Sequence, residues 1–163
     1  MVPQLGTPLF PDPGTKLIQP YHIEHFNGDA VAFVGIDIAQ KTQVSSQPFD
    51  TTPFLDEVTT AQNQINMLTA MGYDKIGLVT HQGYGNDIDL ASMVSGVDFI
   101  VGGDSHTLVG DHSALGIGGT GDYPTITTDL SGNTTCIVQA WEYSKVVGNL
   151  NVQFDADGNV VSC

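Results

Sequence analysis

The feature that most constrains this chain is a strand–helix–strand pattern across residues 75–103. An apolar run, KIGLVT at 75–80, predicts a buried strand. NDIDLASMV at 86–94 predicts a short helix with an Asn or Asp cap, and VDFIVGG at 97–103 predicts the next strand. Strands joined by such a crossover run parallel, and we expect these two to be adjacent. The pattern predicts a layered α/β or α+β fold with a mixed sheet.

The rest of the chain supplies further strands and one longer helix, and its 163 residues fit a single domain spanning 1–163. Residues 21–36 predict a hairpin that turns at Asn27-Gly28, and apolar residues at helical spacing predict a helix over 54–71. Gly72 is the expected C-cap of that helix. The other expectations are an extended Pro- and Gly-rich lead-in at 1–20, a loop at 37–53, and short strands in PTITTD, TCIVQA and VGNLNVQF.

Three side chains that can bind metals follow the two central strands. His81 comes directly after the first strand, and Asp104 and His106 follow the second. Parallel neighbours end at the same edge of a sheet, about 4.8 Å apart, and open α/β sheets usually place their sites there. Imidazole and carboxylate together suit Zn, Mn, Fe or Co better than Ca. The sequence therefore predicts a metal site at this edge, with an ordinary polar turn as the alternative.

The remaining histidines and the two cysteines are given structural interpretations. His22 and His25 are expected to be surface or structural residues, and His112 a loop residue rather than a ligand. Two cysteines make neither a disulfide framework nor a thiolate cluster. Cys136 is expected in the core and Cys163, the last residue, is expected to be mobile.

The net charge of this chain limits the kinds of partner that we expect it to bind. Four Lys, no Arg and 18 acidic residues give a formal net charge of −14. Phosphate contacts need a basic surface, so nucleic acid and anionic membranes are not expected as partners. No apolar run reaches the roughly 18 residues that span a membrane. The N-terminus has neither the basic nor the apolar region of a signal peptide, so these features do not indicate a compartment.

A long stretch of this sequence resembles part of a known enzyme family. THQGYGNDIDLASMVSGVDFIVGGDSHTLVG resembles the second half of the metallophosphoesterase domain of the 5′-nucleotidase and UDP-sugar hydrolase family. That family shows Thr-His-x-Gly followed by a strand ending in Gly-His-Ser, and bacterial NAD nucleotidases end the strand in Gly-Asp-Ser-His, as here. The match runs from about Lys16 to Val161. It implies half of a four-layer fold, in which a mixed β-sheet sandwich is flanked by helices.

The resemblance also implies roles for individual residues. His81 and Asp104 match the ligands of one of the family's two metals, and His106 matches a ligand of the other. The implied cofactors are divalent ions (Mn, Zn, Co or Mg), and the implied substrate is a nucleotide or another phosphoester. Family habit implies a periplasmic or secreted location.

The family's domain opens with three motifs in order, and that series does not occur in this chain: an Asp-x-His after the first strand, a Gly-Asp with a bridging aspartate, and a Gly-Asn-His. Asp104-Ser105-His106 fits Asp-x-His by itself, but the other two motifs do not follow it and its context matches the late motif better. None of the four Gly-Asn pairs here is followed by His. We therefore expect a truncated hydrolase domain with weak or no activity alone, completed by an N-terminal half or by further copies of the chain. The alternatives are a non-catalytic metal-binding or oligomerising module and an inactive folded remnant.

Overall fold

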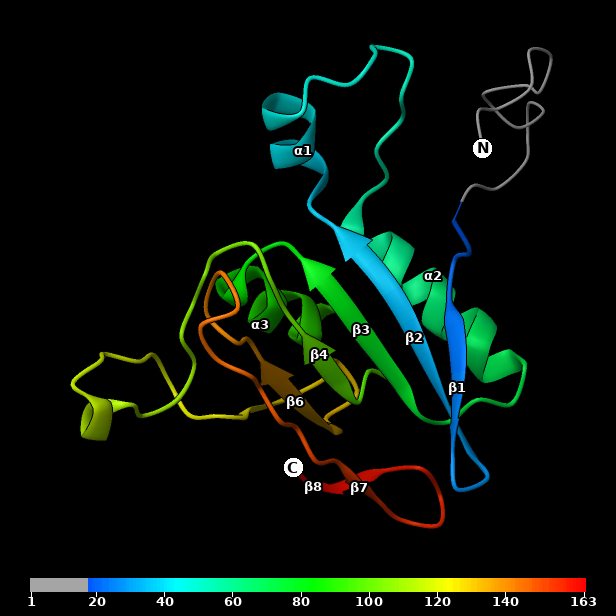
Figure 1. Cartoon of the computed structure of the whole chain (residues 1–163). Helices are drawn as coiled ribbons and strands as arrows, with labels where there is room; N and C mark the ends of the chain where they lie inside the picture. The colour runs from blue at the N-terminus through cyan, green and yellow to red at the C-terminus, as the bar shows by residue number, and fades with distance from the viewer. Residues whose placement is uncertain (1–17) are drawn as a thin grey trace, which may run out of the picture.

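The computed structural model describes residues 18–163, so the lead-in expected at 1–20 lies almost wholly outside the described residues. Figure 1 shows the elements along the chain. They are β1 (His22–Phe26), β2 (Asp29–Asp37), α1 (Ala39–Ser45), α2 (Glu57–Ala70), β3 (Ile76–His81), α3 (Tyr84–Met93), β4 (Phe99–Val101), the 3₁₀ helix η1 (Ser113–Leu115), β5 (Thr125–Thr128), β6 (Thr134–Val138), β7 (Gln153–Phe154) and β8 (Val160–Ser162).

Six strands form one mixed sheet in the order β1-β2-β3-β4-β6-β5. β2, β3, β4 and β6 are parallel, while the outer strands β1 and β5 run antiparallel to their neighbours. The expected parallel pairing of the two central strands is confirmed, with Gly77 opposite Phe99. The β1–β2 hairpin is confirmed as well, and Asn27 and Gly28 both take positive φ at its turn. The mixed α/β fold class predicted from the sequence is thus confirmed.

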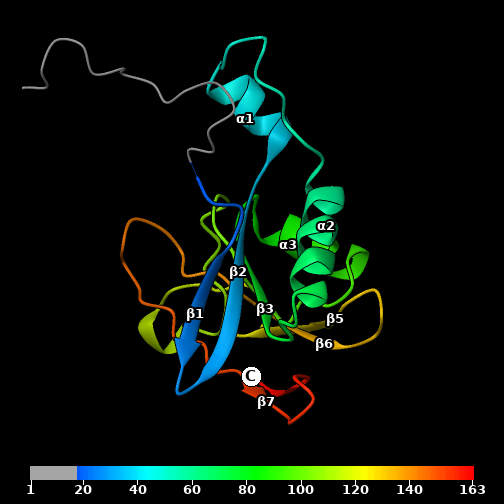
Figure 2. The same ribbon diagram turned by 90° about the vertical axis from the view of Figure 1, so that its right-hand side faces the viewer.

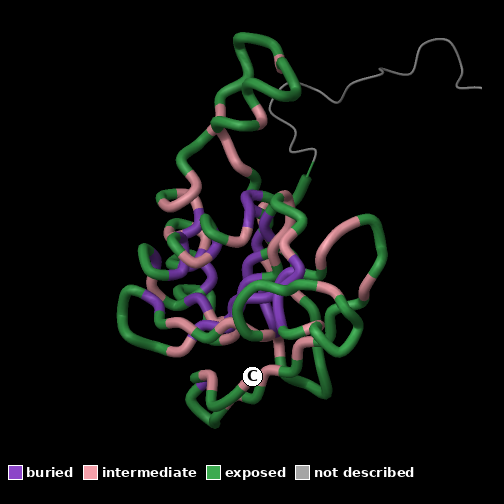
Figure 3. Tube along the Cα trace, turned by 90° about the vertical axis from the view of Figure 1, so that its left-hand side faces the viewer, coloured by how far each residue is buried: buried purple, intermediate pink, exposed green. Residues whose placement is uncertain are grey.

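Helices α2 and α3 pack on the same face of the sheet, as Figure 2 shows. Ala61, Ile65 and Leu68 recur at helical spacing on α2 and are buried against the strands. The helix expected over 54–71 begins at Glu57, because Asp56 caps it by accepting a 2.8 Å hydrogen bond from the Thr59 amide. The buried residues gather in the middle of the molecule, between these helices and the sheet (Figure 3).

The C-terminal segment covers part of the opposite face. Val31, Phe99 and Cys136 form a smaller buried cluster there, against which Phe154 and Val160 of the β7–β8 hairpin pack. Cys136 lies in the core as expected, but Cys163 forms a disulfide with it. The prediction that Cys163 is mobile was wrong, because β8 brings the end of the chain back to β6.

Other local expectations are corrected by the structure. The segment 37–53, expected to be a loop, contains helix α1. Helix α3 begins at Tyr84 rather than Asn86, after Gly83 at φ 96° and without a side-chain cap. Of the strand expected in VGNLNVQF, only the last two residues are paired, as β7. Across residues 18–163, none of the helices combines the length and apolar character that crossing a membrane requires.

Candidate metal centre

His81 and Asp104 meet at the carboxyl edge of the sheet. His81 is the last residue of β3 and lies in register with Asp37 of β2. Its Nε2 is 3.4 Å from Oδ1 of Asp104, in the loop after β4. The imidazole is 67% exposed and the Asp104 side chain 13%, so the pair is open to solvent from the histidine side. The structure therefore brings together two of the three residues predicted from the sequence.

His106 lies apart from this pair. Its Nδ1 is 3.3 Å from Oε2 of Glu142, and its ring packs edge-on against Tyr143 with 5.1 Å between centroids. Lys145 also contacts Glu142, and these contacts hold the pKa of the Glu142 carboxyl below its usual range. Within residues 18–163, no group of three or more His, Cys, Asp or Glu side chains lies close enough to hold a metal ion. The metal roles of the three predicted residues stay a prediction.

The loop carrying Asp104 and His106 has an unusual backbone that buried polar groups support. Asp104 and His106 have φ values of 76° and 53°, in the left-handed region that non-glycine residues rarely adopt. Between them, Ser105 donates a 3.0 Å hydrogen bond to Oε1 of Gln139 and accepts one from the Tyr84 amide at the start of α3. The buried Gln139, directly after β6, thus holds the loop through Ser105, and Ser105 in turn contacts the start of α3.

A buried carboxylate, Asp87 of α3, holds the backbone on both sides of His81. Its Oδ1 accepts 2.6 Å and 3.0 Å hydrogen bonds from Thr80 Oγ1 and Gln82 Nε2, the two neighbours of His81. Its Oδ2 has no partner among the described residues and lies where a Cβ on Gly102 would have to go. Burial raises the pKa of the Asp87 carboxyl, which the two hydrogen bonds partly oppose. The Asp87 side chain therefore contacts the residues on both sides of His81 at the end of β3, and Gly102 directly after β4.

The His81–Asp104 pair has the composition and spacing of two metal ligands. Ligands about 2.1 Å from a tetrahedral ion lie about 3.4 Å from each other, and imidazole with carboxylate suits transition metals. Lys41 also contacts Asp104, through its ammonium group. The residues thus fit one side of a divalent-metal site and leave its other positions to further donors.

The site and its surroundings include four residues that the sequence did not indicate, namely Lys41, Glu142, Asp87 and Gln139. Lys41 and Glu142 reach the site from α1 and from the segment after β6, which no sequence motif connects to it. Asp87 was considered only within the capping sequence of a helix. Its spacing of three and four from the apolar Leu90 and Ala91 places it on the buried face of α3 and is the one signal that could have indicated it.

Comparison with known proteins first defines the class. No family model matches this sequence. The fold is that of calcineurin-like phosphoesterases: one from Bacillus subtilis superposes with a TM-score of 0.57 at 21% identity, over 77% of this chain and 43% of that one. This likeness concerns the fold alone.

Two further comparisons define the family. The 5′-nucleotidase precursor of Thermus thermophilus superposes with a TM-score of 0.83 at 40% identity, over 88% of this chain and 28% of that one. The NAD 5′-nucleotidase of Haemophilus influenzae is 35% identical over 162 residues, which are 96% of this chain and 27% of the relative. Over nearly its whole length the chain is therefore similar to 5′-nucleotidases. It spans about a quarter of the length of the curated relatives it matches.

Proposed function

We propose that this chain forms part of a metal-dependent phosphoester or pyrophosphate hydrolase that acts on nucleotides. The observation that carries the proposal is the 3.4 Å approach of His81 Nε2 to Asp104 Oδ1 at the carboxyl edge of the sheet. The relatives named 5′-nucleotidase and NAD 5′-nucleotidase support the reaction class and the substrate class.

In this proposal each residue has a separate task. His81 and Asp104 hold one divalent cation (Mn, Zn, Co or Mg), and His106 contributes to a second position. Bound metal supplies an activated water and polarises the phosphoryl oxygens. Lys41 balances the charge of Asp104 and offers a cation to the substrate phosphate. Asp87 and Gln139 hold the residues at the carboxyl ends of β3 and β4 in position. This matters because metal sites depend on the residues that orient their ligands.

We further propose that the site is incomplete in this chain alone and that turnover is weak. Only two of the proposed ligands lie together, and the sequence has no counterpart to the three earlier family motifs. Another polypeptide segment, corresponding to the N-terminal half, or a second copy of the chain would supply the remaining donors.

Hydrolysis assays test the proposal. The metal-stripped chain is assayed with an aryl phosphate, AMP and NAD in added Mn, Co, Zn or Mg, beside His81→Ala and Asp104→Ala. We expect metal-dependent turnover, slow in the chain alone, that both substitutions abolish. His22→Ala, an exposed histidine on β1, is the matched control and should keep full activity. Turnover that survives loss of His81, or that needs no metal, would contradict the proposal.

A second candidate is a non-catalytic metal-binding or oligomerising module. Val79 and Val101 are 47% and 39% exposed at the ends of the central strands, on the sheet face opposite α2 and α3. An open apolar face of this kind favours association. Metal uptake or a defined oligomer in analytical ultracentrifugation, without turnover in any metal or with any added segment, would favour this candidate.

We also propose a periplasmic or secreted location. The Cys136–Cys163 disulfide supports it, because disulfides persist mainly in oxidising compartments. The Thermus thermophilus relative is named as a precursor, which agrees with processing during export. Detection of the oxidised chain in a reduced cytoplasm and its absence from the extracytoplasmic fraction would contradict this location.

A further inference from the structure

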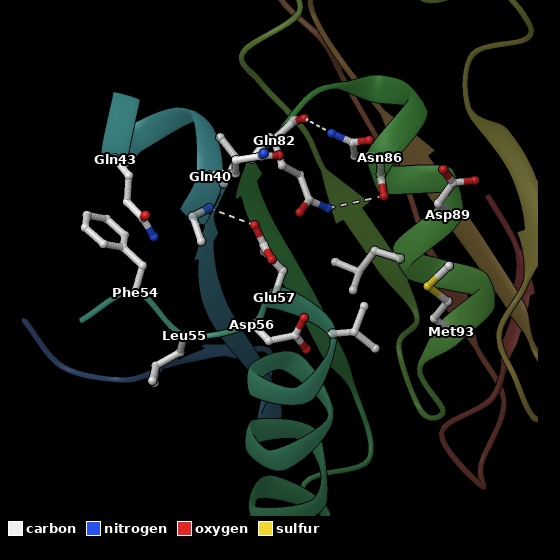
Figure 4. A pocket seen from close by; sticks show the side chains of 14 residues that line it. Gln40, Gln43, Phe54, Leu55, Asp56, Glu57, Gln82, Asn86, Asp89 and Met93 are labelled. Atoms are coloured by element: carbon white, nitrogen blue, oxygen red, sulfur yellow. Dashed lines mark hydrogen bonds between the residues drawn. The ribbon is translucent and has the colours of Figure 1, made fainter. Parts of the chain in front are cut away.

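The surroundings of the candidate metal centre differ in the donors that they offer. Beside the centre, between α1, the start of α2 and α3, lies a pocket of about 600 Å³ (Figure 4). Asp56, Glu57 and Asp89 line this pocket, but none of its lining residues is a histidine, and three carboxylates alone do not define a ligand. The remaining predicted ligand is His106, in the loop after β4. The contacts that hold His106 therefore bear most directly on how the centre is completed.

The backbone around His106 is joined to the segment that follows β6. The Trp141 amide donates a 3.1 Å hydrogen bond to the Thr107 carbonyl. Leu108 pairs with Ala140 in an antiparallel bridge. This pairing brings His106 next to the residues that follow Trp141.

Glu142 contacts one particular nitrogen of His106. Its Oε2 lies 3.3 Å from Nδ1, whereas Nε2 forms no hydrogen bond or ion pair with another residue in the range 18–163. The carboxylate itself is held, because its Oε1 contacts the ammonium group of Lys145. That ammonium group also lies 4.5 Å from the centre of the Trp141 ring. Glu142 therefore faces Nδ1 and leaves Nε2 without a partner.

The backbone of this segment has an uncommon conformation. Trp141, Tyr143 and Ser144 have φ values of 58°, 48° and 56°. Left-handed backbone costs about 1–2 kcal/mol per residue for L-amino acids, and it persists only where the surrounding structure holds it. Here the Tyr143 ring packs edge-on against the imidazole of His106, with 5.1 Å between centroids. Two consecutive residues of one segment thus contact the imidazole.

The position of the carboxylate determines which form of the neutral imidazole is favoured. A neutral imidazole carries a proton on one ring nitrogen and a lone pair on the other, and an ionised carboxylate can only accept. A carboxylate beside Nδ1 therefore favours the proton there and leaves the lone pair on Nε2. A histidine that binds a metal usually donates its other ring N–H to a carboxylate or a carbonyl, which fixes the tautomer and the orientation of the ring. Glu142 and His106 are arranged in this way.

We propose that Glu142 is a positioning residue of the candidate metal centre, which fixes the proton of His106 on Nδ1 and presents Nε2 to a divalent cation. Lys145 acts through Glu142 by holding its carboxylate. The metal part of this inference rests on the proposed function, which gives His106 a place at the second metal position. The tautomer needs no metal, so it can be tested in the chain by itself.

The tautomer of His106 is measured by long-range ¹H–¹⁵N NMR of the metal-free chain at about pH 8.5, where an ordinary imidazole is neutral. We expect Nδ1–H at His106, which is the less common tautomer of free histidine. His22 is the internal reference, because its carboxylate partner Glu24 lies 3.2 Å from Nε2 and favours the opposite tautomer. The two histidines should therefore show opposite patterns in one spectrum.

Substitutions at Glu142 assign the effect to its carboxylate. Glu142→Ala should return His106 to the Nε2–H tautomer. Glu142→Gln, whose amide oxygen can still accept, should keep part of the Nδ1–H form. Glu24→Ala is the matched control and should leave His106 unchanged. A residue that only packed against the loop would not change the tautomer in this order.

Zinc then tests the positioning role. Added Zn²⁺ should shift the ¹⁵N resonance of Nε2 of His106 in the unaltered chain, because zinc binds the ring nitrogen that carries the lone pair. Glu142→Ala should weaken this local binding about tenfold or more, as loss of a carboxylate that orients a metal ligand does. Glu24→Ala should not weaken it.

Three results would overturn the proposal while the proposed function stands. They are an Nε2–H tautomer in the unaltered chain, a tautomer that Glu142→Ala leaves unchanged in a chain whose spectrum shows it folded, and zinc bound through Nδ1. The expected tautomer without any zinc shift at His106 has a different meaning. It would remove His106 from the proposed metal site and leave Glu142 as a structural contact, so that both proposals fail at this residue.

Discussion

Gly102 directly follows β4, and the buried Asp87 carboxylate fills the space that a side chain at this position would need. A methyl group there would overlap Asp87 Oδ2 and lie 3.5 Å from the Val138 carbonyl, so the backbone or the carboxylate would have to move. We expect Gly102→Ala to lower the free energy of unfolding by about 2 kcal/mol or more, as overpacked buried sites do.

Chemical denaturation measures this effect. Gly85→Ala is the matched control, because Gly85 lies on helix α3 with no atom within 4 Å of a built Cβ. It should be neutral or stabilising by up to about 1 kcal/mol, since Ala favours a helix. Equal stability of Gly102→Ala and the unaltered chain would contradict the tight contact.

Asp98 is expected to make stability depend on pH. Burial, with Asp129 and Asp74 nearby, raises the pKa of the Asp98 carboxyl from 3.8 to about 7, although the Ile76 amide donates to it at 2.7 Å. The folded chain then holds a proton that the unfolded chain has lost. Stability should therefore fall by a few kcal/mol as the pH rises from about 4 to about 7, at about 1.4 kcal/mol per pKa unit.

Asp98→Asn tests this pH dependence, because an amide oxygen can still accept from Ile76. The free energy of unfolding of the variant, measured by denaturation between pH 4 and 8, should fall less steeply than that of the unaltered chain. The buried Asp87 leaves part of the slope in place. Asp50→Asn, an exposed carboxylate, should keep the full slope. If the free energy of unfolding of Asp98→Asn falls with pH as steeply as that of the unaltered chain, the pH dependence comes from other groups.

At the residue scale, the sequence predicted that His81 and Asp104 meet, but it also placed His106 with them and did not indicate what holds these residues. His81 and Asp104 were expected at one edge because parallel strands end together, and the structure brings them to 3.4 Å. The direction of His106 depends on Glu142 and Tyr143, which follow a later strand. No local pattern encodes such a contact, because it arises only when β6 joins the sheet.

At the scale of elements, the disulfide ties the β7–β8 hairpin to the main sheet. Cys136 of β6 and Cys163 are 27 residues apart, and a bridge closing a loop of this length stabilises by about 3.5 kcal/mol in the chain-entropy estimate. We expect Cys163→Ser to lower the free energy of unfolding by about 2–4 kcal/mol. Amide hydrogen exchange should increase in the hairpin before it increases in the six-stranded sheet.

A reductant supplies the control for this prediction. It should destabilise the unaltered chain to the level of Cys163→Ser and leave the variant unchanged. Equal stability of the oxidised and reduced chains would show that the bridge does not restrain the hairpin.

The elements that the sequence predicted well are those with strong local signals. The Asn27-Gly28 turn located the hairpin, and apolar spacing located α2 to within three residues of its start. Helix α1 was missed because it buries no residue and therefore shows no apolar periodicity. The start of α3 was misplaced because Gly83 precedes it without a capping side chain, while Ser105 from another loop binds the Tyr84 amide.

At the scale of the whole molecule, the acidic composition affects how metal binding must be measured. A net charge of −14 attracts divalent cations to many exposed carboxylates, such as those of the turn at 155–159. Total metal uptake therefore does not report on the candidate centre. A local readout does, because a paramagnetic ion broadens only the resonances of nearby nuclei.

The candidate metal centre is tested most directly by Mn²⁺ titration of the chain, followed by NMR at substoichiometric metal. We expect resonances of His81 and of residues 103–105 to broaden first, before those of the turn at 155–159. His81→Ala and Asp104→Ala should each remove this preference. Broadening that begins at the acidic turn, or that is unchanged in both variants, would contradict a metal centre at the carboxyl edge of β3 and β4.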